Sequence, residues 1–356
     1  MPVSAVFMQN FRLFEERELS LSNLNCLIKG QNGSGKTTCL EAINLLLTRK
    51  SSRTRNLTEC IKRNQEGFLL GLQGSIKNQG LKIHLRKSLN ERVAFKAELN
   101  NKTVKNNEIS VCQFIQAKNL RFIEGEPELR RDLFSSIMFH VEHESYLISQ
   151  RYKRTLNQRN TVLKRRGSGK ELNIWTDRLI EEGLELKKKH KEFFKNFYDL
   201  SMEIVNDIST EEGLFFLKGM KVKLDRGWGE EISFKESLYR ALEKDKILGY
   251  TTTGPHKLDL KFYIQGKIAK SVLSRGQQKL LTLLIYFKMD NILNESNDAG
   301  SICLIDDISS ELDRENLRII LERIILLKSQ VVITAIGGEK EEIETPLLSQ
   351  FNQINL

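Results

Sequence analysis

The chain has 356 residues, 40% of them hydrophobic, and a formal net charge of +10. This length is ample for a packed core and predicts two lobes rather than one domain of usual size. No apolar run approaches the roughly 20 residues of a membrane span, and the first residues lack the pattern of a signal peptide. We therefore expect a cytoplasmic protein without a membrane partner. The basic excess favours a polyanionic partner, nucleic acid before a membrane surface.

The first predicted element is a strand-like segment from Val3 to Leu21, rich in aromatic and apolar residues. We expect it to pair beside a second strand at Asn25 to Lys29. A glycine-rich loop and a helical pattern from Thr38 to Leu47 follow this second strand.

The loop has the sequence Gly30-Gln31-Asn32-Gly33-Ser34-Gly35-Lys36-Thr37, followed by Thr38, and is typical of a phosphate loop. Its glycines let the backbone turn tightly and aim successive N–H groups into one concavity, at which the following helix also points its positive end. In that arrangement Lys36 reaches the β- and γ-phosphates, and the Thr37 hydroxyl binds the bridging Mg²⁺. The predicted ligand is Mg-ATP or Mg-GTP.

A basic loop, residues 48–63, comes next and has six cationic residues against the single acid Glu59. Its Arg53 and Arg55 are candidate DNA contacts, but a solvated surface turn explains the composition equally well. Three strand-like runs then predict an antiparallel meander at 68–76, 81–89 and 93–99.

A mainly helical lobe is predicted after one more buried strand at 111–116. The chain turns helical after Gly125-Glu126-Pro127, so we place an inserted helical lobe with a short arm at 126–249. Residues 1–125 and 250–356 then form the nucleotide-binding domain. Within the lobe, residues 166–169 (Arg-Gly-Ser-Gly) predict the turn between two helices of a hairpin arm.

The first helix of this arm carries eight basic residues and no acid between Arg151 and Lys170, while Tyr152, Leu156 and Leu163 supply a buried stripe. The charged residues would then project outward and could neutralise phosphates. A plainly solvated helix face remains the alternative. The candidate DNA contacts here are Arg154, Arg159, Lys164 and Arg165.

The histidines and cysteines of the chain give no clear metal signal. His140 and His143 could share a helix face but lack an evident third ligand, which favours packing or surface roles. The five cysteines are odd in number, widely spaced and without a Cys-x-x-Cys pair. This pattern favours reduced thiols over disulfides or a zinc site.

Strand-like patterns return at 214–224 and 258–268, and Ser274-Arg275-Gly276-Gln277 then opens an apolar helical run. The Ser274 hydroxyl and the Gly276 N–H, with Gln277 beside them, could form a second anion-binding device at a helix N-terminus. An ordinary serine N-cap accounts for the same residues.

A buried strand from Ile302 ends in two carboxylates, Asp306 and Asp307. Asp306 would hold the Mg²⁺, and Asp307 would orient the attacking water or accept its proton. A strand that simply ends in a polar turn is the alternative. Residues 310–313 (Ser-Glu-Leu-Asp) lead into a helix, and 330–336 is the final core strand expected.

The order of these motifs resembles that of the ATP-binding-cassette ATPases, in which the signature of one subunit closes on the nucleotide held by another. Over nearly its full length the chain is similar to the RecF family of bacterial recombination and replication-repair ATPases. Besides the motifs above, the resemblance rests on these segments: Asn10-Phe11-Arg12, Leu40-Glu41-Ala42-Ile43, Gly125-x-Pro127-x-x-Arg130-Arg131, Gln158-Arg159-Asn160 and Gly254-Pro255-His256-Lys257-x-Asp259.

The resemblance implies an α/β fold with an ATP-binding-cassette-type head, in which mixed and antiparallel sheets surround the phosphate-loop core. It implies a weak ATPase that needs Mg²⁺, forms a homodimer on DNA when ATP is bound, and is released by slow hydrolysis. The implied DNA is duplex next to single-stranded gaps. The implied partners are the RecO and RecR mediator proteins, which help to load the RecA recombinase.

Two departures from the family pattern occur. Ala117-Lys118 stands where a Pro-Glu pair is usual, so Gln113 and Gln116 are only candidates for the Q-loop glutamine, and Lys257 replaces the usual arginine. Two other functions share some of these motifs. A transporter ATPase subunit would need a membrane partner and has no evident use for a basic arm. A chromosome-organising SMC-type ATPase would need a long coiled coil, and the roughly 240 residues between phosphate loop and signature contain no long heptad array.

Overall fold

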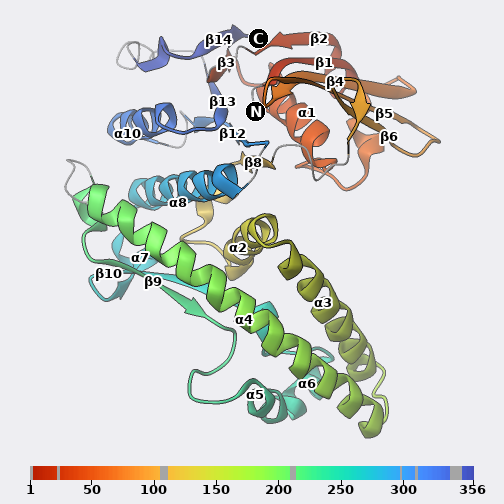
Figure 1. Ribbon diagram of the computed structural model, residues 1–356, viewed down its shortest axis with the longest axis vertical. Helices are drawn as coiled ribbons and strands as arrows, with labels where there is room; N and C mark the ends of the chain where they lie inside the picture. Colours follow the sequence, from red (N-terminus) through yellow and green to blue (C-terminus); the bar gives the residue numbers. More distant parts are fainter. Residues whose placement is uncertain are drawn as a thin grey trace. The chain divides into compact units, whose positions relative to one another are not determined.

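The computed structural model describes residues 3–21, 25–104, 111–208, 214–296, 299–308, 312–336 and 347–356. The chain forms two compact units (Figure 1), one made of Met1–Arg121 with Ser274–Leu356 and the other of Phe122–Leu273. The second unit extends beyond the lobe placed at 126–249, because the strand at 259–264 pairs within this unit. In the described part of the chain, no helix has the length and hydropathy needed to cross a membrane.

The first unit contains a six-stranded antiparallel sheet with the order β2-β1-β4-β5-β6-β7. The predicted meander is confirmed as β4, β5 and β6, which pair in register through tight turns at positive-φ residues such as Lys77 and Asn78. The strands are β1 (Val3–Phe11), β2 (Phe14–Ser20), β4 (Gly67–Ile76), β5 (Gln79–Ser88), β6 (Ala94–Leu99) and β7 (Lys102–Thr103).

A five-stranded parallel sheet has the order β14-β3-β13-β12-β8. The prediction that the first segment pairs beside β3 is wrong, because β1 lies between β2 and β4 in the antiparallel sheet, whereas β3 lies between β14 and β13 in the parallel sheet. β14 adds a strand that the sequence pattern did not predict. The strands are β3 (Cys26–Gly30), β8 (Val111–Ile115), β12 (Ser301–Ile305), β13 (Gln330–Ile336) and β14 (Asn352–Asn355).

The helix α1 (Lys36–Thr48) packs against strands of both sheets (Figure 1), including β4 and β5 on one side and β8 and β13 on the other. Every residue from Lys36 to Leu47 except Thr37 is buried, although the polar side chains of Thr37, Glu41, Asn44 and Thr48 share one face of the helix. On the parallel sheet, α8 (Arg275–Ser296) contacts β8 and β12, and α10 (Arg314–Ile325) contacts α8. A short 3-10 helix, η1 (Leu57–Cys60), lies in the basic loop.

The second unit is built on three helices, α2 (Pro127–Val141), α3 (His143–Lys164) and α4 (Gly169–Ile208). The predicted hairpin arm is confirmed, since α3 and α4 contact each other and are joined by residues 165–168. Phe134 of α2 packs edge-on against Phe193 and Phe197 of α4, with ring centroids 4.9 and 6.4 Å apart. These aromatic contacts fix α2 against the long helix.

A small antiparallel sheet with the order β11-β10-β9 completes the second unit. The strand predicted at 214–224 begins only at Met220, because η4 (Phe215–Leu217) precedes it. The remaining elements are β9 (Met220–Asp225), α5 (Phe234–Arg240), α6 (Leu242–Leu248), η5 (Pro255–Lys257), β10 (Asp259–Ile264), β11 (Lys267–Ile268) and α7 (Ala269–Val272).

Candidate functional site: a phosphate loop and two carboxylates

The phosphate loop connects the end of β3 to the start of α1. Gly33 and Gly35 have φ values of 83° and 103°, a region that side-chain-bearing residues rarely adopt. A Cβ atom on Gly35 would lie 2.4 Å from a ring carbon of Phe14, so this position has no room for a side chain. The loop therefore turns directly into α1, whose first N–H groups have no partner within the helix and face an incoming anion.

Lys36 is the first residue of α1 and is nearly buried, with 8% of its surface exposed. Its ammonium group donates hydrogen bonds to the carbonyl oxygens of Gly30 and Gln31, at 2.7 and 2.9 Å. The charge is thus held across the loop by two neutral acceptors. A phosphate oxygen would be a stronger, charge-assisted partner for it.

Thr37 and Asp306 meet at the carboxyl-terminal edge of the parallel sheet. The Thr37 hydroxyl donates to the Asp306 carboxylate at 2.9 Å, and the Thr334 hydroxyl donates to the same oxygen at 2.9 Å. Thr334 lies on β13, between the strands that precede the loop and the carboxylates. Parallel pairing therefore brings together side chains that are 269 positions apart in sequence.

Asp307, the next residue, has φ of 53°, and its backbone N–H donates to the Thr334 hydroxyl at 2.7 Å. A positive φ is uncommon outside glycine and is tolerated best by aspartate and asparagine. The chain therefore turns at Asp307, directly after the Asp306 carboxylate at the end of β12.

The residues fit a nucleotide and a hard divalent cation. The hydroxyl of Ser34 is buried within the loop without a hydrogen-bond partner among the described residues, an unsatisfied polar group that a phosphate oxygen would satisfy. Thr37 and Asp306 supply adjacent oxygen donors, the ligand type that Mg²⁺ prefers.

The segment predicted as a second anion-binding device opens α8. The Ser274 hydroxyl accepts from the Gln277 N–H at 3.2 Å, and the Gln277 side chain accepts from the Ser274 N–H at 3.0 Å. This is a reciprocal N-cap, as the alternative interpretation expected. Gly276 lies close to Asp313 and Asn316, at the start of α10. Within the described chain, neither Ser274 nor Gln277 hydrogen-bonds to the phosphate loop.

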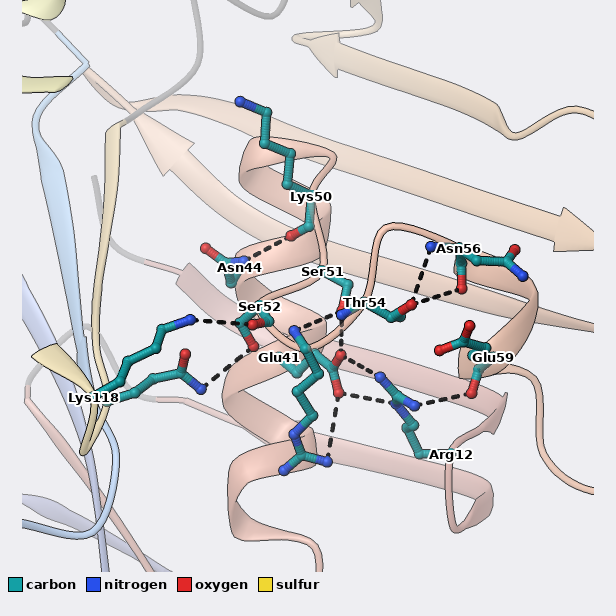
Figure 2. Close-up of polar contacts among 12 residues, drawn as sticks. Arg12, Glu41, Asn44, Lys50, Ser51, Ser52, Thr54, Asn56, Glu59 and Lys118 are labelled. Atoms are coloured by element: carbon teal, nitrogen blue, oxygen red, sulfur yellow. Dashed lines mark hydrogen bonds and ion pairs between the residues drawn. The ribbon is translucent and has the colours of Figure 1, made fainter. Parts of the chain in front are cut away.

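The basic loop is tied to α1 by Glu41, whose side chain has no exposed surface (Figure 2). Arg12 donates two hydrogen bonds to the Glu41 carboxylate, at 3.0 and 2.7 Å, and the Ser51 hydroxyl donates at 2.5 Å. A guanidinium nitrogen of Arg53 lies 3.8 Å from a carboxylate oxygen of Glu41. A buried carboxylate needs such compensation, and here it connects α1 to the turn after β1 and to the basic loop.

Glu41 also affects the electrostatics of Arg12. Burial by itself would lower the pKa of the Arg12 guanidinium, but the hydrogen bond and charge of Glu41 outweigh burial, so the pKa is raised. This loop has two candidate DNA contacts. Arg53 forms a long ion pair with Glu41, while Arg55 is exposed and pairs with no acid among the described residues.

In the arm, the structure separates the four candidate DNA contacts. Arg154 and Lys164 are exposed, and Arg165 is exposed but paired with Glu171. Arg159 has no exposed surface and forms an ion pair with the equally buried Asp245 at 2.9 Å. Contrary to the sequence-based prediction, Arg159 therefore cannot contact DNA in this fold.

The two candidate Q-loop glutamines differ in position. Gln113 is buried inside β8, whereas Gln116 follows the end of β8 at the edge where the Asp306 N–H donates to the Ile115 carbonyl. The Gln116 side-chain amide donates to the Ser52 hydroxyl at 3.5 Å. The Lys118 ammonium donates to the Ser52 carbonyl at 3.4 Å (Figure 2). Only Gln116 therefore lies at the same sheet edge as the phosphate loop.

Three residues of the site were assigned no role from the sequence: Arg12, Glu41 and Thr334. Glu41 had a detectable signal, since it is the only charged residue between Thr37 and Thr48 in a mostly apolar helix. Thr334 had none, because one threonine in a strand is common. Glu311 and Ser310 of the last motif lie outside the described residues.

Comparisons with known proteins show which family this chain is similar to. Residues 2–345 match the sequence family described as the RecF/RecN/SMC N terminal domain. The chain is 31% identical over 344 residues to the DNA replication and repair protein RecF of Aliivibrio salmonicida, covering 96% of this chain and 94% of the relative. It is 30% identical to the RecF protein of Aliivibrio fischeri, again covering 96% and 94% of the two chains.

Two solved structures show the same fold. One is the recombination mediator protein RecF with ATP in the RecFOR pathway, with a TM-score of 0.76, 23% identity and coverage of 95% and 92% of the two chains. The other is an Smc head bound to the C-winged helix domain of ScpA, with a TM-score of 0.55, 15% identity and coverage of 100% and 94%. The expected ATP-binding-cassette-type head is confirmed by these similarities.

Proposed function

This chain belongs to the RecF family within the RecF/RecN/SMC N-terminal domain proteins, and on that premise we propose that it is an ATP-dependent DNA-binding protein of recombination repair. The observation that carries the proposal is the contact of Thr37 with Asp306 beside the phosphate loop. It brings the loop and the strand-end carboxylates into one site of the kind that binds nucleoside triphosphates.

Within this site each residue has a proposed function. Lys36 exchanges its carbonyl partners for the β- and γ-phosphates, while the N–H groups of residues 33–38 hold the phosphate oxygens. Thr37 and Asp306 hold Mg²⁺, which when bound neutralises charge on the phosphates. Asp307 orients the attacking water and accepts its proton. The reaction is the hydrolysis of ATP to ADP and phosphate. Slow hydrolysis is part of the proposal.

The assembly we propose is a dimer with two shared nucleotides. Ser274 and Gly276 present donors at a helix end that is not joined to the phosphate loop of the same chain. A second copy related by a two-fold axis would place these donors on the γ-phosphate, so that ATP stabilises the dimer and hydrolysis releases it.

The proposed polyanion is DNA, with duplex beside a single-stranded gap as the preferred form. The exposed cations Arg55, Arg154 and Lys164 support this, because each is available to a phosphate. By similarity to the RecF protein of the RecFOR pathway, RecO and RecR are the proposed partners. The cytoplasm is the proposed location.

Sedimentation velocity tests the assembly. With saturating ATP and a gapped duplex the protein should sediment as a dimer on DNA, whereas with ADP it should stay monomeric. Ser274→Arg should bind ATP as a monomer and fail to hydrolyse it. An unchanged monomer–dimer distribution of the wild type at saturating ATP would rule out the shared site.

A mixing experiment sharpens this test. In a heterodimer of Ser274→Arg and Asp307→Asn, one composite site combines intact carboxylates with an intact signature, and the other site carries both defects. If mixing is random and the sites work independently, ATPase activity should recover to at most about a quarter of wild type.

A further inference from the structure

A cavity of about 640 Å³ lies in the second unit, lined by α4, β9, the loop that follows β9, and residues near η5. We call it the α4–β9 cavity. Its volume is in the range of sites that bind small ligands or side chains of a partner. None of its lining residues belongs to the nucleotide site, and α4 and β9 are in contact beside it (Figure 1).

The walls of the α4–β9 cavity combine cations with apolar side chains. Lys187, Lys191 and Lys223 line it, and within the described chain none of the three forms an ion pair, although the Lys223 ammonium lies 5.5 Å from the centroid of the Tyr263 ring. Glu230 is the acid among the lining residues. Apolar surface comes from Phe194, Val222, Leu224, Pro255 and Leu258. The cavity therefore suits a ligand that has both negative charge and apolar groups.

A buried donor without an acceptor lies in the same wall. Trp228 is 8% exposed, and its indole N–H has no hydrogen-bond partner among the described residues. An unsatisfied buried donor costs about 1–3 kcal/mol, but this nitrogen is itself buried and a ligand in the cavity does not reach it. The ring itself is covered by Lys187 and Arg226, at 5.7 and 5.1 Å, and by Phe234 at 4.9 Å. It is not an open platform for stacking a nucleobase.

The cavity also borders the edge of a sheet. β9 is the terminal strand of the order β11-β10-β9, and in the part of the chain that the structure describes it pairs with β10 alone. Val222, Lys223 and Leu224 belong to β9 and line the cavity. Alternate N–H and C=O groups of such an edge strand are open to pairing, and an extended peptide is the ligand that matches them.

We propose that the β9 edge and the α4–β9 cavity bind an extended acidic segment of a partner protein. Its backbone would pair with β9, its carboxylates would lie beside Lys187, Lys191 and Lys223, and its apolar side chains would pack against Phe194 and Leu224. The open strand edge favours a peptide over a nucleotide, and the three lysines without an ion pair in the described chain favour acidic over neutral peptides.

A peptide selection tests the proposal. Phage-displayed random heptapeptides are selected on the full-length protein after depletion on the variant Lys187→Glu/Lys191→Glu. We expect enrichment of peptides in which Asp or Glu alternates with apolar residues. A fluorescein-labelled selected peptide should bind the double variant at least tenfold more weakly by fluorescence anisotropy. The control Lys188→Glu/Lys195→Glu, with the same charge change on α4 outside the cavity, should bind within about twofold of wild type.

Amide hydrogen exchange of the wild-type protein is an independent test, because it does not depend on the folding of a variant. The bound peptide should slow exchange in β9 and leave β11, at the other edge of the sheet, unchanged. Enrichment without acidic residues, equal loss in both double variants, or unaltered exchange in β9 would overturn the proposal. The proposal would also be overturned if ATP or a dT oligonucleotide displaced the peptide and its own binding required Lys187 and Lys191. The site would then belong to a nucleotide or nucleic acid.

Discussion

Replacing Arg159 by methionine should destabilise the second unit strongly, without weakening the binding of DNA by the folded protein. Methionine keeps much of the aliphatic stem but removes the guanidinium. In the structure this group donates to Asp245 at 2.9 Å, to Thr251 at 2.6 Å and to Thr176 at 3.0 Å. Arg159 and Asp245 both have no exposed side-chain surface.

The magnitude follows from the charge that is left behind. Without Arg159, the buried Asp245 carboxylate keeps only its bonds from the N–H and hydroxyl of Thr252, at 2.9 and 2.7 Å, among the described residues. Removing one partner of a buried pair costs about 3–5 kcal/mol. For a unit of this size, that corresponds to a fall in melting temperature of roughly 6–20 °C.

The assay is thermal unfolding by calorimetry, combined with DNA binding at a temperature where the variant is folded. Arg154→Met on the same helix is the control, since Arg154 is exposed and its loss should change stability by less than about 0.5 kcal/mol. Arg159→Met/Asp245→Asn should recover part of the lost stability, because the buried carboxylate is then neutral. A wild-type melting temperature together with weakened DNA binding in Arg159→Met would contradict a structural role for this residue.

Three further predictions concern the nucleotide, the DNA and a buried acid. Lys36→Ala should lose most of its ATP affinity in a titration, whereas Asp307→Asn should bind ATP normally and hydrolyse it poorly; equal affinity of Lys36→Ala and wild type would contradict the assignment. Charge reversal at Arg154, Lys164 and Arg165 should weaken DNA binding and lower the slope of log affinity against log salt by up to about 3, with nucleotide binding unchanged; an unaltered slope would make the arm a solvated face. Burial raises the pKa of Asp290 to about 6, although the Ser329 and Ser301 hydroxyls lower it in part. Because the folded protein then binds this proton more tightly than the unfolded chain, stability should fall as pH rises from about 4 to 6 and stay low above it. Asp290→Asn should remove this dependence and gain on the order of 3 kcal/mol at pH 8, and a urea titration that shows no gain would count against it.

Local spacing in the sequence was enough to predict several elements of this protein. The phosphate loop, the meander, the hairpin arm and the strand before Asp306 were each predicted, because their glycines, alternation and helical periodicity act within about ten to twenty residues. Even the burial of Arg159 had a local signal. It lies seven residues after Tyr152 and four before Leu163, on the stripe that the sequence already predicted as buried.

The contacts between segments that are distant in sequence could not be predicted in this way and are seen in the folded structure. Nothing in residues 3–21 distinguishes pairing with β3 from pairing with β4, because both partners are apolar strands and register depends on which faces are buried. The contact of Thr37 with Asp306 and Thr334 likewise depends on the order β3-β13-β12, which is set by how the helices cover the parallel sheet. Long-range pairing of this kind is a property of the whole packed core, and no local pattern contains it.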